Sequence, residues 1–120
     1  MANQKHVLIA EDEKPLAHAL ELKLQHEGFT TTVAHNGKEC LEFLSAQNFD
    51  ILLLDLMMPE VDGFQVLEQL SKKDKPPTVF VLSNLSQKED EDRVLAAGAT
   101  KYFVKSDTPL SVIVDEVTKA

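Results

Sequence analysis

Apolar residues occur in five short runs along the chain. The runs cover residues 6–10, 31–34, 49–55, 78–83 and 101–105. The third and fourth runs are almost continuously apolar, whereas a strand with one solvated face would alternate apolar and polar residues. We therefore predict five strands, of which the third and fourth are covered on both faces.

The segments between these runs have the residue spacing of amphipathic helices. In the first segment a leucine recurs at every fourth position, from 16 to 24. Pro15 precedes these leucines at a position tolerated in a first helical turn, and Gly28 follows them as a stop signal. Similar patterns occur in residues 36–46, 63–70, 88–98 and 108–117. The last of these begins with Thr108–Pro109, which we predict to form the cap and first turn.

Strands and helices alternate five times, which predicts an α/β fold. Such a chain forms a parallel sheet with helices on both faces. The expected architecture is a doubly wound, five-stranded (βα)5 fold of the flavodoxin-like type. The length of 120 residues favours a single domain over residues 1–120, with an ordered core of about 5–119.

Composition and charge narrow the classes of function. The hydrophobic fraction of 43% and the charged fraction of 27% are those of an ordinary globular protein. No apolar run approaches the roughly 20 residues of a membrane span, and the first residues lack a secretion signal. The net charge of −8 argues against direct binding of nucleic acid, since phosphate contacts require clustered Lys and Arg. The single cysteine, Cys40, excludes an internal disulfide and fits a cytoplasmic protein.

Chemically active side chains follow the predicted strands at their carboxyl ends, where ligands bind in sheets of this type. Carboxylates about 4 Å apart repel each other by roughly 4 kcal/mol at an effective dielectric constant of 20, so clustered acids need a cation. Oxygen ligands without His or Cys suit Mg²⁺, or alternatively Mn²⁺, and not zinc. The residues concerned are Glu11, Asp12 and Glu13 after the first strand, Asp55 after the third, Ser83 after the fourth and Lys105 after the fifth.

This set of groups is suited to phosphoryl transfer. A carboxylate beside a hard cation can attack a phosphoryl group, and Asp55 is the natural nucleophile, forming an acyl phosphate. Lys105 would pair with one phosphoryl oxygen and Ser83 would donate a hydrogen bond to another. Each residue alone could be a helix cap or a turn former. Their joint placement at four strand ends favours the catalytic interpretation.

Four segments resemble the receiver domain of two-component response regulators, and the resemblance covers essentially the whole chain. "VLIAEDE" contains the acidic pair Glu11 and Asp12, and "DILLLDLMMPEVDG" contains the phosphoacceptor position, Asp55. "VFVLSN" contains the hydroxyl position, Ser83. "AAGATKYFVK" contains the aromatic position, Tyr102, and the lysine position, Lys105.

The resemblance implies that a histidine kinase or a histidine phosphotransfer protein donates a phosphoryl group to the aspartate. It implies a metal site made by Glu11, Asp12, Asp55 and the main-chain carbonyl of Met57, with Glu11 acting through water. The domain would catalyse its own phosphorylation and dephosphorylation. Phosphorylation would draw the serine hydroxyl inward, let the tyrosine ring move and change an output surface within residues 86–119. That surface would act on a downstream protein or a fused output domain, in the cytoplasm and away from any membrane.

Three features depart from the family pattern. Ser106 follows the lysine where the family usually has a proline after a cis peptide bond. A cis bond to another residue costs about 2.5–4 kcal/mol, which favours a trans bond here. Asn84 stands where a very small residue is favoured, which predicts tighter access to the phosphoryl group. Met57 and Leu85 occupy positions that resemble sites tuning dephosphorylation, and because neither can orient an attacking water, we expect slow self-dephosphorylation.

Three alternative functions compete with this interpretation. A degenerate receiver that is never phosphorylated would act only as an interaction module, with Ser106 as its best support. A flavodoxin-like electron carrier needs a phosphate cradle rich in Ser, Thr and Gly after the first strand, but the loop there is "EDEKP". A haloacid-dehalogenase-like phosphatase needs a second aspartate two residues after the nucleophile, and Met57 occupies that position.

Overall fold

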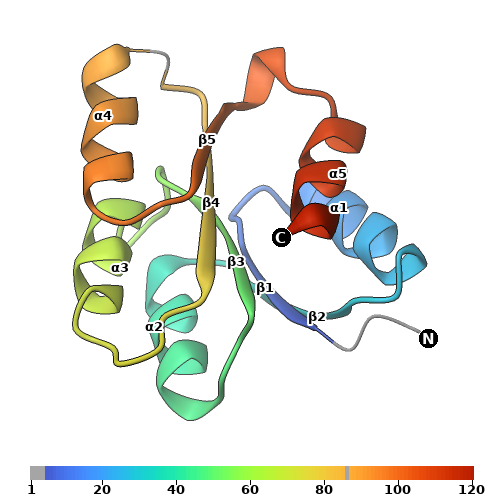
Figure 1. Ribbon diagram of the computed structural model, residues 1–120, viewed down its shortest axis with the longest axis horizontal. Helices are drawn as coiled ribbons and strands as arrows, with labels where there is room; N and C mark the ends of the chain where they lie inside the picture. Colours follow the sequence, from blue (N-terminus) through green and yellow to red (C-terminus); the bar gives the residue numbers. More distant parts are fainter. Residues whose placement is uncertain (1–4, 86) are drawn as a thin grey trace.

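Five parallel strands form one sheet with the order β2-β1-β3-β4-β5 in a computed structural model that describes residues 5–85 and 87–120 (Figure 1). The strands are β1 (His6–Ala10), β2 (Thr30–Ala34), β3 (Ile51–Asp55), β4 (Thr78–Ser83) and β5 (Lys101–Val104). The central strand β3 pairs with β1 on one side and β4 on the other, so that Leu53 lies between Ile9 and Phe80. The predicted α/β fold is confirmed.

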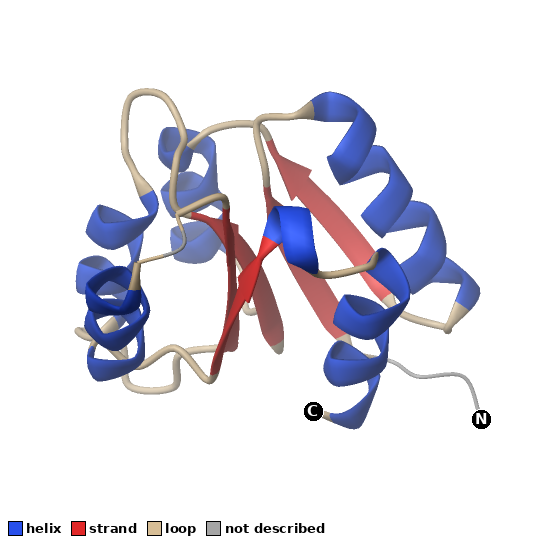
Figure 2. Ribbon diagram, turned by 90° about the horizontal axis from the view of Figure 1, so that it is seen from above, coloured by secondary structure: helices blue, strands red, loops and turns tan. Residues whose placement is uncertain are grey.

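Helices cover both faces of the sheet, as Figure 2 shows from a second direction. The helices are α1 (Lys14–His26), α2 (Gly37–Ala46), α3 (Gly63–Leu70), α4 (Lys88–Ala96) and α5 (Leu110–Lys119), with a short 3-10 helix, η1 (Lys105–Asp107), before α5. One apolar cluster joins the sheet to α2, α3 and α4, and a second joins it to α1 and α5. None of the helices within the described ranges is long and apolar enough to cross a membrane.

The strand β3 is apolar throughout because it contributes to both clusters. Leu52 and Leu54 belong to the cluster under α2 to α4, whereas Ile51 and Leu53 belong to the cluster under α1 and α5. Side chains along a strand point alternately to opposite faces, so a central strand with helices on both sides has no solvated face. Burial of each such side chain contributes about 1.5–3 kcal/mol.

Cys40 lies in the first of these clusters and is fully buried. Burial raises the pKa of its thiol to about 12. The thiol is therefore a small apolar core group, in agreement with the position of Cys40 on the apolar side of its helix.

The ends of several elements differ from the sequence-based prediction. The strand β5 ends at Val104, which pairs with Ser83, the last residue of β4, so Lys105 has no strand partner and begins η1 instead. Thr108 does not cap α5, because its hydroxyl donates to the Val104 carbonyl at 2.9 Å and Pro109 takes the capping position. By contrast, the helix α4 stops at Ala96, and Gly98, with a φ of 110°, follows the capping residue as the helix-terminating glycine that its sequence position predicts.

The expected domain limits stay a prediction. Residues 1–4 and Ser86, the first residue of the expected output surface, lie outside the described residues.

Candidate functional site

The carboxyl ends of the strands bring together residues that are far apart in the sequence. Glu11 directly follows β1, Asp55 is the last residue of β3 and Ser83 is the last residue of β4. Lys105 is the first residue after β5. Glu11, Asp55 and Ser83 are the polar residues that are buried within the described parts of the chain. The edge of the sheet predicted to hold the site therefore holds the expected side chains.

Three acids form a cluster at this edge. Glu11 and Asp55 are buried, and Asp12 is exposed beside them. One carboxylate oxygen from each of these residues lies within 4.8 Å of the others. The three acids predicted as metal ligands from the sequence thus come close enough to share one cation.

Lys105 inserts its ammonium group into this cluster. Its Nζ lies 2.8 Å from Glu11 Oε1 and 3.1 Å from Asp55 Oδ2. No peptide bond among the described residues is cis, so the bond to Ser106, which the sequence left open, is trans. The ammonium therefore reaches the phosphoacceptor position without the cis bond that the family usually has after the lysine.

Glu13 is a further partner of the ammonium, at 2.9 Å between Glu13 Oε2 and Lys105 Nζ. From the sequence, Glu13 was predicted to lie among the acids after the first strand, but no role was predicted for it. The feature that could have indicated a contact with Lys105 is its position two residues after Glu11. The main-chain N–H of Glu13 also donates to Glu11 Oε2 at 3.1 Å, which holds the two residues together.

Burial makes the negative charge at this site costly. Burial, together with the charge of Asp55, raises the pKa of Glu11 to about 7 despite the lowering effect of the hydrogen bond from Lys105. Burial also raises the pKa of Asp55, although hydrogen bonds from Met57 and Lys105 favour the charged form. Burial opposes the charge of Lys105, but its carboxylate partners outweigh this and raise its pKa. One ammonium serves several acids, and the site is left with excess negative charge.

Glu11 Oε1 supports a cation at this position. This oxygen lies near Lys105 Nζ but forms no hydrogen bond of acceptable geometry. Among the described residues, it is the buried side-chain polar atom that is left without such a bond. A divalent cation would use such an oxygen as a direct ligand or through water. The oxygen-only donor set of Glu11, Asp12 and Asp55 suits Mg²⁺ or Mn²⁺. The part of the main-chain carbonyl of Met57 in this set stays a prediction.

The hydroxyl and aromatic residues of the site meet at the same loop residue. Ser83 is fully buried, and its Oγ accepts a hydrogen bond from the Leu85 N–H at 3.0 Å. The Tyr102 hydroxyl donates to the Leu85 carbonyl. Burial raises the pKa of that hydroxyl, and the nearby charges of Asp90 and Glu91 add to the effect. The loop after β4 is thus held from both sides by the two residues predicted to switch.

The segment after Asp55 is closely packed. A Cβ atom added at Gly63 would lie 2.8 Å from the Asp55 carbonyl oxygen, so only glycine fits at the start of α3. The Gly63 N–H donates to the Leu56 carbonyl at 2.9 Å. Asp62 and Gln65 close this end with a reciprocal capping box. These contacts fix the loop that leads away from the phosphoacceptor position.

The residues that depart from the family pattern lie one or two positions after Asp55, Ser83 and Lys105 in the chain, and the structure gives the exposure of their side chains. Met57 is 59% exposed although it is large and apolar. Leu85 is partly buried and Asn84 is exposed. The effects of these residues on access and on dephosphorylation stay predictions.

Comparison with known proteins agrees with this geometry. Residues 7–115 match the family model described as the response regulator receiver domain. The chain is 37% identical over 100 residues to the uncharacterized transcriptional regulatory protein YkoG of Bacillus subtilis, covering 83% of this chain and 44% of that protein. It is 34% identical over 100 residues to the response regulator ArlR of Staphylococcus epidermidis, covering 83% of this chain and 45% of ArlR. The chain therefore spans less than half the length of these two relatives.

Solved structures give the same assignment. The receiver domain of the Francisella response regulator 1452 has 33% sequence identity and a TM-score of 0.87, with 97% of this chain and 98% of that chain covered. The response regulator TrrA of Thermotoga maritima, solved in complex with Mg²⁺-BeF, has 30% identity and a TM-score of 0.83, with 97% and 98% covered.

Proposed function

This chain belongs to the family of response regulator receiver domains, and on that premise we propose that Asp55 is the residue that accepts the phosphoryl group. The observation that carries the proposal is the buried Asp55 carboxylate, which lies 3.1 Å from Lys105 within a cluster of metal-competent acids. The chain is a receiver domain of two-component response regulators. The proposed phosphoryl donor is a histidine kinase or a histidine phosphotransfer protein.

The geometry suggests a role for each side chain. A carboxylate oxygen of Asp55 attacks phosphorus, the new O–P bond forms, and the P–N bond to the donor histidine breaks with its electron pair left on the imidazole nitrogen. The Met57 N–H, 3.0 Å from Asp55 Oδ1, holds the carboxylate in place. Lys105 then transfers its hydrogen bond from Asp55 to a phosphoryl oxygen, and Ser83 donates to another.

The acidic residues are proposed to hold Mg²⁺ or Mn²⁺. Glu11, Asp12 and Asp55 would provide carboxylate oxygens, and Met57 would provide its main-chain carbonyl. When bound, such an ion offsets the charge of the acids and of the incoming phosphoryl group. The complex of TrrA with Mg²⁺-BeF supports this assignment.

The proposed output surface is formed by α4, β5 and α5. The Ser83 Oγ accepts from the Leu85 N–H and would donate its own proton to a phosphoryl oxygen on Asp55. As the hydroxyl moves toward that oxygen, it would draw along the Leu85 loop, to which Tyr102 is also bonded. The proposed target is a downstream protein or an output domain of a longer chain in the cytoplasm. With a net charge of −8 this domain would not bind nucleic acid directly.

The phosphoacceptor role predicts a mass increase of one phosphoryl group when the protein is incubated with acetyl phosphate and Mg²⁺. Intact mass spectrometry measures the increase. We expect it to be absent without the metal ion and absent in the Asp55→Asn variant, because the amide is not a nucleophile at this site. A mass increase that persists in the variant would place the phosphoryl group elsewhere.

If acetyl phosphate does not increase the mass of the wild-type protein, the next test is binding of beryllofluoride, a mimic of the phosphoryl group. Binding of beryllofluoride would show that the site is competent but requires a protein donor. Failure of both reactions would favour the degenerate receiver over the phosphoacceptor. We do not favour that alternative, because Asp55, Lys105 and Ser83 are all chemically competent and lie at one edge of the sheet.

The lifetime of the phosphoryl group tests the part played by Met57. Its exposed thioether cannot orient a water for attack on the acyl phosphate, so we expect slow hydrolysis in the wild type. Met57→Gln adds a group that can hold such a water and should shorten the lifetime about tenfold or more. The decay of the phosphorylated mass measures it, with Met58→Gln as a buried control expected to act through stability alone. Equal rates of phosphoryl loss in the wild type and Met57→Gln would show that the Met57 side chain does not set the lifetime.

A further inference from the structure

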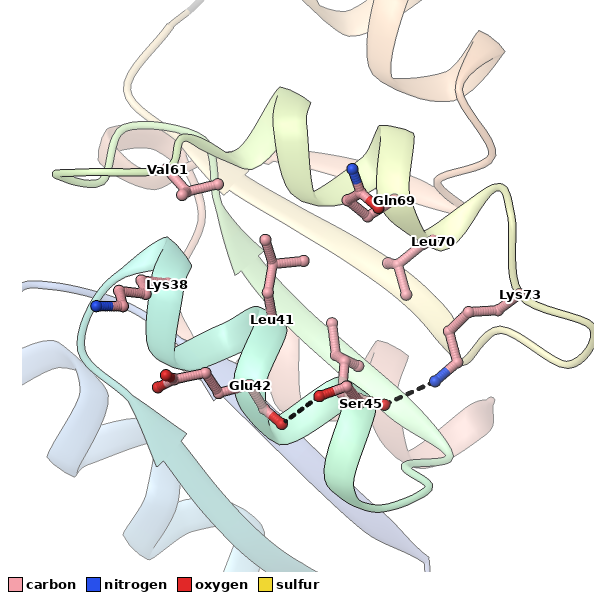
Figure 3. A pocket seen from close by; sticks show the side chains of 9 residues that line it. Lys38, Leu41, Glu42, Ser45, Val61, Gln69, Leu70 and Lys73 are labelled. Atoms are coloured by element: carbon pink, nitrogen blue, oxygen red, sulfur yellow. Dashed lines mark hydrogen bonds between the residues drawn. The ribbon is translucent and has the colours of Figure 1, made fainter.

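A surface pocket lies between α2 and α3, apart from the acidic cluster, with a volume of about 510 Å³ (Figure 3). Pockets that hold small molecules in proteins have volumes of about 300–1,000 Å³. Its lining includes the apolar residues Leu41, Val61 and Leu70. The phosphoacceptor chemistry makes no use of this pocket.

The apolar wall of the pocket comes from both helices. Figure 3 shows Leu41 of α2 and Leu70 of α3 pointing into the same space. Leu41 packs against the core on one side but is only partly buried. An apolar body placed between the helices would cover its remaining surface, and such burial is favourable.

Two lysines lie at the polar ends of this wall. The Lys73 ammonium donates to the Leu44 carbonyl at 2.7 Å, near the end of α2, and is fixed there. Lys38 is exposed near the start of α2, and no described residue forms an ion pair or a hydrogen bond with its ammonium. Glu42 also lines the pocket, so two lysines and one glutamate leave the lining with a net positive charge. That sign is opposite to the net charge of −8 of the whole chain.

We propose that this pocket is a binding site for a small amphipathic anion. The apolar body lies against Leu41 and Leu70, and the acidic group pairs with Lys38. Lys73 is the less suitable partner, because its ammonium already serves a carbonyl near the C-terminal end of a helix, where the helix dipole repels an anion. Lys38 is the second residue of α2, where the dipole attracts one.

One end of the pocket adjoins the loop that follows the phosphoacceptor. A Cβ atom added at Gly37 would lie 1.8 Å from the Val61 carbonyl oxygen, so the start of α2 is in close backbone contact with this loop. Val61 lines the pocket and precedes the capping residue of α3. We therefore expect an occupant to change the rate at which Asp55 gains a phosphoryl group. This coupling rests on the proposed function, whereas the binding itself does not.

The test is a titration of the ¹⁵N-labelled chain with octanoate, followed by ¹H–¹⁵N NMR. We expect saturable shifts of the amides of residues 37–45, 61 and 69–73. Octan-1-ol has the same chain without the charge and should bind more weakly. Lys38→Gln should weaken octanoate binding about two- to fivefold, the range expected for an exposed ion pair. Lys23→Gln, which lines a different pocket between α1 and α5, is the matched control and should leave the affinity unchanged.

Five results would overturn the binding proposal, and four of them concern titrations with ligand. These four are no shifts with octanoate, shifts centred on α1 and α5, equal affinity for octan-1-ol, and equal affinity of wild type and Lys38→Gln. Amide shifts that depend on protein concentration without any ligand would assign the pocket to contacts between copies of this chain, which also overturns it. The NMR readout requires neither Mg²⁺ nor phosphorylation, so failure of the proposed function would not be mistaken for failure of binding. An unchanged phosphorylation rate at saturating octanoate would overturn the coupling.

Discussion

Without metal ions, the Asp55→Asn variant will be more stable to unfolding than the wild type by about 1–2 kcal/mol, because a buried carboxylate with raised pKa opposes folding. Its side chain is 3% exposed and shares Lys105 with two other acids. An asparagine oxygen can still accept the Met57 N–H, and its amide can donate to Glu11. The variant therefore keeps the contact with Met57, gives up the ion pair with Lys105, and removes one negative charge from a cluster in which one ammonium serves three acids.

Urea unfolding in the presence of EDTA measures this difference. Asp50→Asn is the matched control, because Asp50 is an exposed aspartate just before the same strand and accepts the His6 N–H at 2.8 Å. We expect the control to change the free energy of unfolding by less than about 0.5 kcal/mol, since its carboxylate is solvated. Adding Mg²⁺ should stabilise the wild type and reduce the difference in the free energy of unfolding between it and Asp55→Asn. A variant less stable than the wild type in EDTA would show that Asp55 does not carry an excess charge.

Much of the fold follows from patterns that the sequence displays directly. β3 could be predicted as a strand covered on both faces because its apolar run has no polar face, and β1 and β4 could be predicted from their own apolar runs. Strand ends were harder to predict. Lys105 continues the apolar run of β5 in the sequence, but β4 offers it no partner, and the chain turns into η1. Such an ending depends on the length of the neighbouring strand, which local sequence does not contain.

The candidate site also has residues that could be predicted from the sequence and contacts that could not. Asp55, Asp12 and Lys105 could be predicted because a parallel sheet brings the carboxyl ends of its strands to one edge. The contact of Glu13 with Lys105 could not, because it depends on the direction in which a long side chain leaves the cap of α1. Similarly, no pattern in the sequence indicates that Ser83 and Tyr102 both bond to Leu85. These contacts depend on the conformation of a loop, for which no periodic pattern exists.

The pocket between α2 and α3 was also not predictable. Leu41 and Leu70 each occupy the apolar side of their own helix, where a core position is the ordinary expectation. The space between them arises from the separation of α2 and α3. Gly37 contributes to that packing, because any larger residue there would collide with the Val61 carbonyl. The glycine could have been taken for a simple helix start.

Lys105→Met should have the largest effect on stability of any single substitution at the site. Its side chain is 11% exposed, and its ammonium contacts Glu11, Glu13 and Asp55. Removing it leaves these acids without a cation, which we expect to cost about 2–4 kcal/mol in EDTA, slightly below the cost of breaking a fully buried pair. Methionine has a similar length and apolar stem, so the loss reports the charge and not the packing. Phosphorylation by acetyl phosphate should fall as well, because no ammonium would remain to bind the phosphoryl oxygen.

The design of this experiment separates charge from general damage. Lys101→Met is the control, since that lysine pairs with Glu116 at 2.8 Å on the surface, where the pair is worth about 0–1 kcal/mol. In the Asp55→Asn background, Lys105→Met should lower the free energy of unfolding by less, because one of the acids left without a cation is absent. A double-mutant cycle measures this coupling. Mg²⁺ should recover part of the loss by supplying the missing positive charge. If Lys101→Met and Lys105→Met cost the same, or if the cycle shows no coupling, then Lys105 does not balance the acids and the electrostatic account of the site is wrong. A coupled loss that Mg²⁺ reverses in part would instead show that Lys105 balances the charge of these acids in the free site.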